Sequence, residues 1–188
     1  LVFVTQTATG CDVYVATHDG QWQVSLVHSA ASAKFKRVRA ADLDGDGFVD
    51  LAAWDKTGDV LRGDGSGAFQ LEQGVIDPMN RYETPLFLVD LNGDHRADML
   101  TAEAYGEGTL LYGYYFRTHL ARAGGGFDEL PRGVAVTYNS DPLLTLDDFD
   151  HYGKCDLLAR GEELSDMDTF RGVGDGTFES AGWSAVPA

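Results

Sequence analysis

The chain has 188 residues, enough for one domain with a hydrophobic core, and 44% of them are hydrophobic. Its 30 acidic and 14 basic residues give a formal net charge of −16. This charge argues against a nucleic-acid partner and an anionic membrane surface, because clustered Lys and Arg side chains bind both. We find no apolar run long enough to cross a bilayer, so we expect no membrane insertion. So large an excess of carboxylates repels itself unless cations offset it.

Residues 1–30 are predicted to form an incomplete copy of the unit that follows them. LVFVTQTATGCDVYVATHDGQWQ aligns with LAAWDKTGDVLRGDGSGAFQ, so that Leu1 matches Leu51. Runs of Val, Leu and Tyr between Gly and Asp residues predict strands here. The acidic loop and the first strand of the later units have no counterpart in this segment.

Residues 31–78 are predicted to form a four-stranded unit. Short runs rich in Val, Leu, Phe and Ala predict strands near residues 35–41, 49–54, 59–62 and 68–75. The acidic segment ADLDGDGFVDLAAW begins at Ala41, between the first two strands, and the glycine-rich LRGDGSGAF begins at Leu61. No ten-residue stretch has a persuasive helical stripe.

The same two motifs recur in residues 79–136 and 137–188. VDLNGDHRADMLTA begins at Val89 and DDFDHYGKCDLLAR at Asp147, and each is followed by a glycine-rich segment, LARAGGGF or FRGVGDGTF. Four short strands in each unit of roughly 40–50 residues are typical of a propeller blade. We therefore predict an all-β chain, a single β-propeller domain or fragment over residues 1–188. It would have about three complete blades and one incomplete N-terminal blade.

The acidic loops predict calcium sites, because Ca²⁺ takes six to eight oxygen ligands and a D-x-D-x-D-G-x-x-D loop supplies them from side chains and one carbonyl. In the first two loops the ligands would be Asp42, Asp44, Asp46, the Phe48 carbonyl and Asp50, then Asp90, Asn92, Asp94, the Arg96 carbonyl and Asp98. In the third loop, Asp148, Asp150 and Asp156 fit, Lys154 holds the carbonyl position, and Tyr152 replaces the central carboxylate. We expect weaker binding there, or none.

Two other interpretations apply to loops of this kind. An EF-hand needs a bidentate Glu at the twelfth position and flanking helices, whereas the twelfth positions here are Ala53, Thr101 and Ala159 in strand-like sequence. Plain Asp/Gly turns are the other interpretation, since both residues favour turns. A bound ion would have a structural role, pinning the turn and offsetting repulsion between its acids.

An acidic loop followed by a strand and a G-x-G-x-F hairpin resembles the FG-GAP/VCBS repeat family of β-propellers, which includes the integrin α-subunit head. ADLDGDGFVDLAAW with RGDGSGAF is a close match, and FRGVGDGTF matches the second half well. The resemblance implies calcium between the first and second strands of a blade, and a secreted or cell-surface protein. Asn92, His95 and Tyr152 depart from the pattern.

We expect a ligand surface on the face opposite the acidic loops. The insertion at residues 105–117 is rich in aromatic residues, and the connections between blades carry amide and Arg groups that could contact a glycan or a protein. The alternative is a long hairpin that packs on itself. The candidates are Tyr105, Tyr112, Tyr114, Asn80, Arg81, Tyr82, Tyr138, Asn139 and Trp54, the tryptophan with the best prospect of exposure.

Other features are interpreted as structural. Trp22 and Trp183 align with core positions, and Arg62-Gly63-Asp64 lies in the hairpin of the repeat, where Gly and Asp are expected. Cys11 and Cys155 could bond to each other, pair elsewhere or stay free.

No catalytic set is recognisable, so we predict a recognition module that binds a glycan or a protein. The alternatives are an accessory or catalytic domain of a secreted polysaccharide-degrading enzyme, with Glu103 or Glu107 as a rim carboxylate, and a structural assembly unit completed by another chain or by the rest of a longer propeller.

Overall fold

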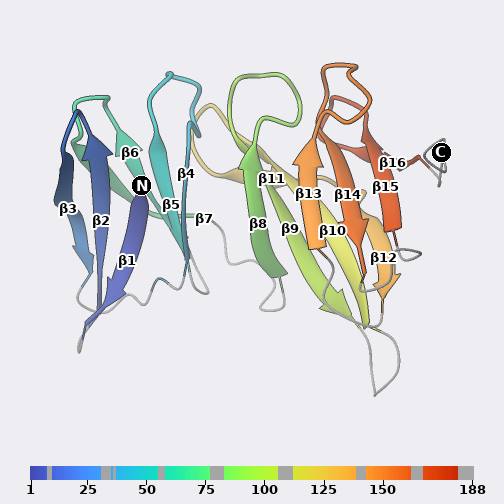
Figure 1. Cartoon of the computed structure of the whole chain (residues 1–188), viewed down its shortest axis with the longest axis horizontal. Coiled ribbons are helices and arrows are strands. Elements are labelled where there is room, and N and C mark those ends of the chain that lie inside the picture. Colours follow the sequence, from blue (N-terminus) through green and yellow to red (C-terminus); the bar gives the residue numbers. More distant parts are fainter. Residues whose placement is uncertain are drawn as a thin grey trace. The chain divides into compact units, whose positions relative to one another are not determined.

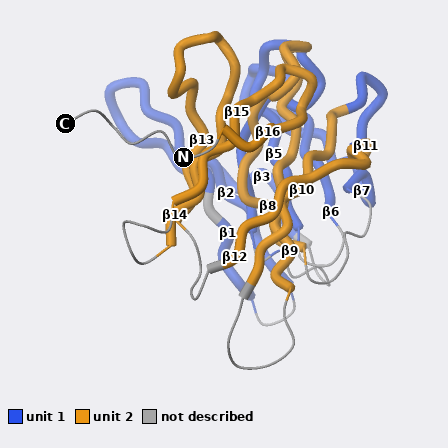
Figure 2. Tube along the Cα trace, turned by 90° about the vertical axis from the view of Figure 1, so that its right-hand side faces the viewer, with its two compact units in different colours: residues 1–81, 122–127 blue, residues 82–121, 128–188 orange. Residues whose placement is uncertain are grey.

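The computed structural model describes residues 1–7, 10–30, 35, 37–54, 58–76, 83–105, 112–138, 143–161 and 167–181. These residues form strands, turns and bends, with no helix among them (Figure 1). The chain divides into two compact units, residues 1–81 with 122–127 and residues 82–121 with 128–188 (Figure 2).

The first unit contains two antiparallel sheets. β1 (Val2–Gln6), β2 (Cys11–His18) and β3 (Trp22–Ala30) form a three-stranded sheet in that order. β4 (Arg37–Ala41), β5 (Asp50–Trp54), β6 (Gly58–Gly63) and β7 (Phe69–Ile76) form a four-stranded one. These four strands confirm the ones predicted from the second segment, with ends shifted by one or two residues.

The second unit contains two more sheets. β8 (Glu83–Val89), β9 (Asp98–Tyr105), β10 (Tyr112–Ala121) and β11 (Phe127–Glu129) lie side by side, and β12 (Val134–Tyr138) pairs with the first half of β10. β13 (Leu143–Asp147), β14 (Asp156–Arg160), β15 (Met167–Gly172) and β16 (Phe178–Ser180) form the last sheet.

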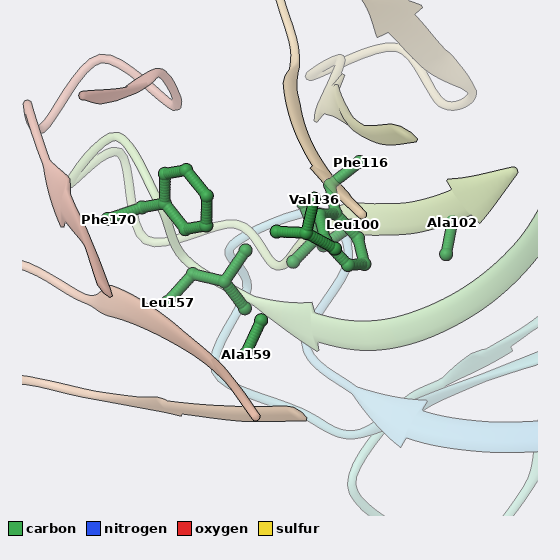
Figure 3. Packing of buried hydrophobic residues seen from close by; sticks show 7 residues of the cluster. All are labelled: Leu100, Ala102, Phe116, Val136, Leu157, Ala159 and Phe170. Atoms are coloured by element: carbon green, nitrogen blue, oxygen red, sulfur yellow. The ribbon is translucent and has the colours of Figure 1, made fainter. Parts of the chain in front are cut away.

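Apolar side chains from two sheets meet inside each unit. In the first unit, Cys11 and Val13 of β2 pack with Leu51, Ala53 and Leu61 of the second sheet. In the second unit, residues from both sheets form one cluster, Leu100, Ala102, Phe116, Val136, Leu157, Ala159 and Phe170 (Figure 3). A single sheet cannot cover both of its faces, so each sheet depends on a neighbour for its core.

The structure therefore confirms the all-β class and the repeated antiparallel sheet. No sheet formed by the described strands closes on itself. The arrangement of the sheets as propeller blades stays a prediction. Among the described residues no helix is long and apolar enough to span a membrane.

Candidate metal centres in the acidic loops

The first acidic loop joins β4 to β5 and is folded around the carboxylate of Asp42. Its two oxygens accept hydrogen bonds from the backbone N–H groups of Gly45 (2.7 Å) and Gly47 (2.9 Å). Further along, Asp46 accepts from the N–H of Phe48 at 2.8 Å. Aspartate side chains accept hydrogen bonds from backbone N–H groups a few residues further along the chain, and these local bonds make Asp-rich segments turn.

The turn brings carboxylates together. One oxygen from each of Asp42, Asp44 and Asp46 lies within 4.8 Å of the others. Two oxygens on opposite sides of a Ca²⁺ ion are about 5 Å apart, twice a Ca–O distance of about 2.4 Å. The spacing of these three aspartates therefore fits a shared cation. Asp50, the fourth predicted side-chain ligand, does not belong to this set of converging oxygens.

The second loop, between β8 and β9, has the same fold with a different charge. Asp90 accepts from the N–H groups of Gly93 (2.7 Å) and His95 (2.9 Å). The Asn92 amide donates to Asp94 at 3.0 Å, and the Arg96 guanidinium forms an ion pair with the same carboxylate. The Arg96 side chain thus neutralises in part a carboxylate that we predicted to bind the metal.

The third loop, between β13 and β14, also gathers its acids. Oxygens of Asp148, Asp150 and Asp156 lie within 4.8 Å of one another. Asp148 Oδ2 accepts from Gly153 N–H at 2.9 Å, but the buried Asp148 Oδ1 has no hydrogen-bond partner. Tyr152, which replaces the central carboxylate of the loop pattern, is 70% exposed. A buried acceptor without a partner is costly, and a cation beside it would remove that cost.

The last aspartate of each loop connects two parts of its own sheet. Asp50, Asp98 and Asp156 are buried, and each accepts one backbone N–H from its own loop and one from the next hairpin. The donors from the loops are Leu43, Leu91 and Phe149, at 3.0–3.1 Å. The donors from the hairpins are Gly63, Ala121 and Gly172, at 2.8–2.9 Å. Both oxygens of these carboxylates therefore accept backbone hydrogen bonds, a structural role that the sequence pattern did not show, and Asp156 also belongs to the converging group of the third loop.

Burial and repulsion between like charges strain the loops electrostatically. Burial raises the pKa of Asp98 to about 6, and the nearby charges of Asp94 and Asp90 act in the same direction. Backbone hydrogen bonds to Asp98 act against this shift and lower its pKa. Burial and the charge of Asp50 raise the pKa of Asp44. A divalent cation would reverse this penalty, because opposite charge favours the ionised form.

Two positions in each loop have a left-handed backbone, three and five residues after the first aspartate. Glycine fills most of them, whereas His95 and His151 adopt φ of 67° and 60°. Left-handed non-glycine residues are uncommon and cost conformational energy. The alternating glycines of the first loop signal these positions in the sequence.

The predicted ligand rim is described only in part. Tyr105 is 46% exposed and its ring lies over Gly113, while Tyr114 is half-buried against the core of the unit. Tyr112 and Tyr138 face each other as Cα partners in β10 and β12. Asn80, Arg81, Tyr82, Glu107 and Asn139 lie outside the described residues.

Two predictions about tryptophan are wrong. Trp54, a candidate for the ligand surface, is 3% exposed, because β5 is buried along its whole length. Trp22, the candidate for the core, is 65% exposed at the start of β3, where its ring contacts the His18 ring edge-on. Trp183 lies outside the described residues.

The tripeptide Arg62-Gly63-Asp64 is engaged internally. Arg62 forms ion pairs with Asp50 (2.8 Å) and Glu72 (3.1 Å), and its side chain is 14% exposed. The guanidinium is therefore not presented to a partner, as the hairpin interpretation predicts. Cys11 and Cys155 are free thiols in the structure.

Sequence reasoning missed a charged cluster on β8–β11. Arg117 forms ion pairs with Glu83 (3.3 Å), Glu103 (3.1 Å) and Glu129 (2.7 Å). His119 Nε2 lies 3.9 Å from Glu83, and burial lowers the pKa of His119 while it raises that of Glu83. Side chains along a strand point alternately to the two faces of a sheet, so their positions on neighbouring strands could have shown that these residues share one face.

An all-β chain with antiparallel sheets and aspartate loops between their first and second strands defines a class of repeat protein. Residues 42–101, from the first acidic loop into β9, match the family model described as an FG-GAP-like repeat. The chain therefore carries an FG-GAP-like repeat, and the resemblance seen in its sequence is confirmed for that segment. A comparison with curated proteins finds no match.

Proposed function

We propose that the chain is a calcium-stabilised recognition module of a secreted or cell-surface protein, which binds a glycan or a protein on the rim opposite its acidic loops. FG-GAP-like repeats are associated with extracellular recognition modules. Extracellular modules with Kd values of about 10⁻⁴–10⁻³ M fill at the calcium levels found outside cells, so loops with few charged ligands suffice.

The convergence of carboxylate oxygens in the loops carries this proposal. Oxygen atoms of three aspartates lie within 4.8 Å of one another in the first loop and again in the third. The buried Asp148 Oδ1 lacks a partner, so the third loop has an acceptor already directed away from solvent. Hard carboxylate oxygens favour Ca²⁺ or Mg²⁺, and the irregular set of donors favours the larger, more tolerant ion.

The position of the rim supports the second half of the proposal. In an antiparallel sheet, the connection between the first and second strands lies at one end and the connection between the second and third at the other. The second acidic loop precedes β9, and Tyr105 ends β9 at the opposite end of the sheet (Figure 1). An exposed Tyr105 on this side offers the kind of flat surface on which sugars and protein side chains pack.

Thermal unfolding in calcium and in excess chelator, with metal content measured per chain, tests the calcium proposal. We expect two or three calcium ions and a Tm that falls on chelation, because a ligand held only by the folded state stabilises it. Asp46→Asn should reduce the calcium-dependent part of Tm, whereas the matched Asp19→Asn, outside the loops, should not. No bound metal together with no change in Tm would overturn the proposal.

A glycan and protein array, probed in calcium, tests the recognition proposal separately. Binding that Tyr105→Ala weakens and Tyr152→Ala leaves unchanged would support a ligand on the rim. Turnover of a polysaccharide that is lost in Glu103→Gln would instead favour the enzyme alternative, and a discrete oligomer without ligand binding would favour the assembly unit.

A further inference from the structure

Two of the acidic loops have an arginine from the following hairpin beside their carboxylates. Arg62 Nη1 lies 2.8 Å from Asp50 Oδ2 and 3.6 Å from Asp44 Oδ2. Arg171 Nε lies 3.0 Å from Asp150 Oδ2. All three aspartates are predicted calcium ligands, so each guanidinium lies beside oxygens that we expect a calcium ion to bind.

The two arginines occupy the same place in their sheets. Gly63 pairs with Phe69 as Gly172 pairs with Phe178, and each arginine directly precedes its glycine. The N–H of each glycine donates to the last aspartate of the loop in its own sheet. Each arginine is therefore held on the hairpin that the buried aspartate ties to the loop.

The second unit brings a guanidinium to the second acidic loop from the loop itself. Leu120 occupies the equivalent hairpin position there, because the N–H of the next residue, Ala121, donates to Asp98. Arg96 forms the ion pair with Asp94, and its Nε donates to the Ala121 carbonyl at 3.3 Å. Each of the three loops thus has a guanidinium next to its hairpin, although the residue that supplies it differs.

The contacts of the arginine coincide with a difference between the first and third loops. Asp50 accepts a hydrogen bond from Arg62 and stays outside the converging oxygens of the first loop. Asp156, the equivalent aspartate, belongs to the converging oxygens of the third loop, where Arg171 lies 4.6 Å from the centre of the Tyr152 ring. The last aspartate thus joins the other carboxylates in the loop where the hairpin arginine contacts a different group.

Glu72 gives the Arg62 guanidinium a second partner outside the loop. Arg62 Nε donates to Glu72 Oε2 at 3.1 Å, whereas the contact with Asp50 uses Nη1. A guanidinium presents several donors in a fixed fork, so one ion pair can break while the other remains. Arg62 can therefore leave Asp50 without becoming an unpaired charge in a site where its side chain is 14% exposed.

We propose that Arg62 and Arg171 are displaceable counter-ions that set the calcium affinity of the first and third loops, an inference that rests on the calcium binding proposed above. Without calcium, each guanidinium offsets the repulsion between the aspartates of its loop. Calcium releases Arg62 from the loop toward Glu72, and releases Arg171 from Asp150. Because an ion pair must break before the ion is bound, each arginine weakens calcium binding at its own loop.

Calcium titration of the isotope-labelled, chelator-stripped chain, followed by NMR, tests the proposal loop by loop. The amides of Gly47, Gly93 and Gly153 report on the first, second and third loops, because each donates to the first aspartate of its loop. Arg62→Gln should tighten binding about tenfold at Gly47 and leave the other two curves unchanged, since it removes a positive charge a few ångströms from one site only. Arg171→Gln should tighten binding at Gly153 alone.

Arg37→Gln is the matched control for the loss of charge. It removes the same charge from the same sheet as Arg62→Gln, but Arg37 is exposed and pairs with Trp54 at the end of β4 and β5 away from the loop. All three curves should stay as in the parent chain. Equal tightening in Arg37→Gln and Arg62→Gln would make the effect one of net charge and overturn the proposal.

Thermal unfolding gives a second measurement. Arg62→Gln should lower the Tm of the chain in excess chelator more than the Tm in saturating calcium, because the counter-ion acts only when the ion is absent. Unchanged or weaker binding in Arg62→Gln and Arg171→Gln, with calcium bound by the parent, would overturn the counter-ion role and leave the calcium proposal standing. A parent chain that binds no calcium would overturn both. Arg171, whose side chain is 52% exposed, keeps the test decisive even if Arg62→Gln fails to fold.

Discussion

The carboxylate of Asp50 accepts a hydrogen bond of 2.9 Å from the backbone N–H of Gly63, and both groups are buried. This bond ties the end of the first acidic loop to the β6–β7 hairpin. The last aspartates of the other two loops make the equivalent bond, to Ala121 and Gly172. Each sheet thus joins its acidic loop to its glycine-rich hairpin through one buried carboxylate.

Replacing Asp50 with Ala should lower the free energy of unfolding by about 3–5 kcal/mol, because it leaves Arg62 and two backbone N–H groups without their shared acceptor. Urea unfolding followed by circular dichroism measures the change. Asp19→Ala, an exposed control, should change the free energy by less than about 0.5 kcal/mol. Equal stability of the two variants would contradict the role assigned to Asp50.

Gly93→Ala should destabilise the chain by about 1–2 kcal/mol, because Gly93 has φ of +80° and a Cβ there meets no neighbouring atom. The cost would thus be one of backbone conformation alone. Gly124→Ala is the matched control, since its Cβ also meets nothing and its φ is not left-handed. If both variants unfold at the same denaturant concentration, the left-handed turn does not limit stability.

Tyr152→Asp should tighten calcium binding at the third loop by about tenfold or more, because it adds the carboxylate that the first two loops have at this position. Tyr152 is 70% exposed and contacts the Arg171 guanidinium, so the change should not open the core. Calorimetric titration of the chelator-stripped chain measures it, with Tyr152→Asn as the uncharged control. If Tyr152→Asp binds calcium with the same affinity as the parent chain, the third loop does not use this position.

The buried His119 should make stability depend on pH. Burial lowers its pKa below the ordinary value of 6.5, so the unfolded chain takes up a proton first as the pH falls. Its contribution to stability is fully present above about pH 6.5 and is lost as the pH falls toward the lower folded pKa. His119→Gln should therefore lose less stability than the parent chain between about pH 7.5 and 5.5.

Glu83 acts in the opposite direction, because its raised pKa makes stability fall as the pH rises above 4.5. Comparing Glu83→Gln with His119→Gln across the same pH range separates the two groups. Parallel curves for the parent and His119→Gln would contradict the prediction.

The two described tryptophans should differ sharply on truncation. Trp54→Ala empties a buried site and should cost about 3–5 kcal/mol. Trp22→Ala loses an exposed ring and its edge contact with His18, and should cost about 1 kcal/mol or less. Chemical unfolding of both variants checks this order, and a larger loss in Trp22→Ala would contradict the exposure found for that residue.

Periodicity was sufficient to predict the strands of residues 37–76. Short apolar runs bounded by glycine and aspartate have few other structures available to them. The same reasoning failed for Trp22, which is exposed. Burial depends on which sheet face is covered, and alignment with a core position of another repeat does not show whether that face is covered.

The predicted metal ligands divide in a similar way. The sequence pattern identified the aspartates that converge, but it could not separate Asp42, whose loop curls around it, from Asp50, which is fully buried and holds the hairpin. Both are aspartates at a ligand position, and only the three-dimensional path of the chain shows which backbone groups reach them.

The sequence by itself determined the all-β class, the repeated acidic loops and the FG-GAP-like repeat, because strand alternation and turn chemistry act between residues close along the chain. The tertiary structure decided which backbone N–H groups the buried aspartates accept, and that Arg117 gathers three glutamates. Those features depend on contacts between segments far apart in the sequence, whose geometry follows from sheet register and packing and not from local pattern.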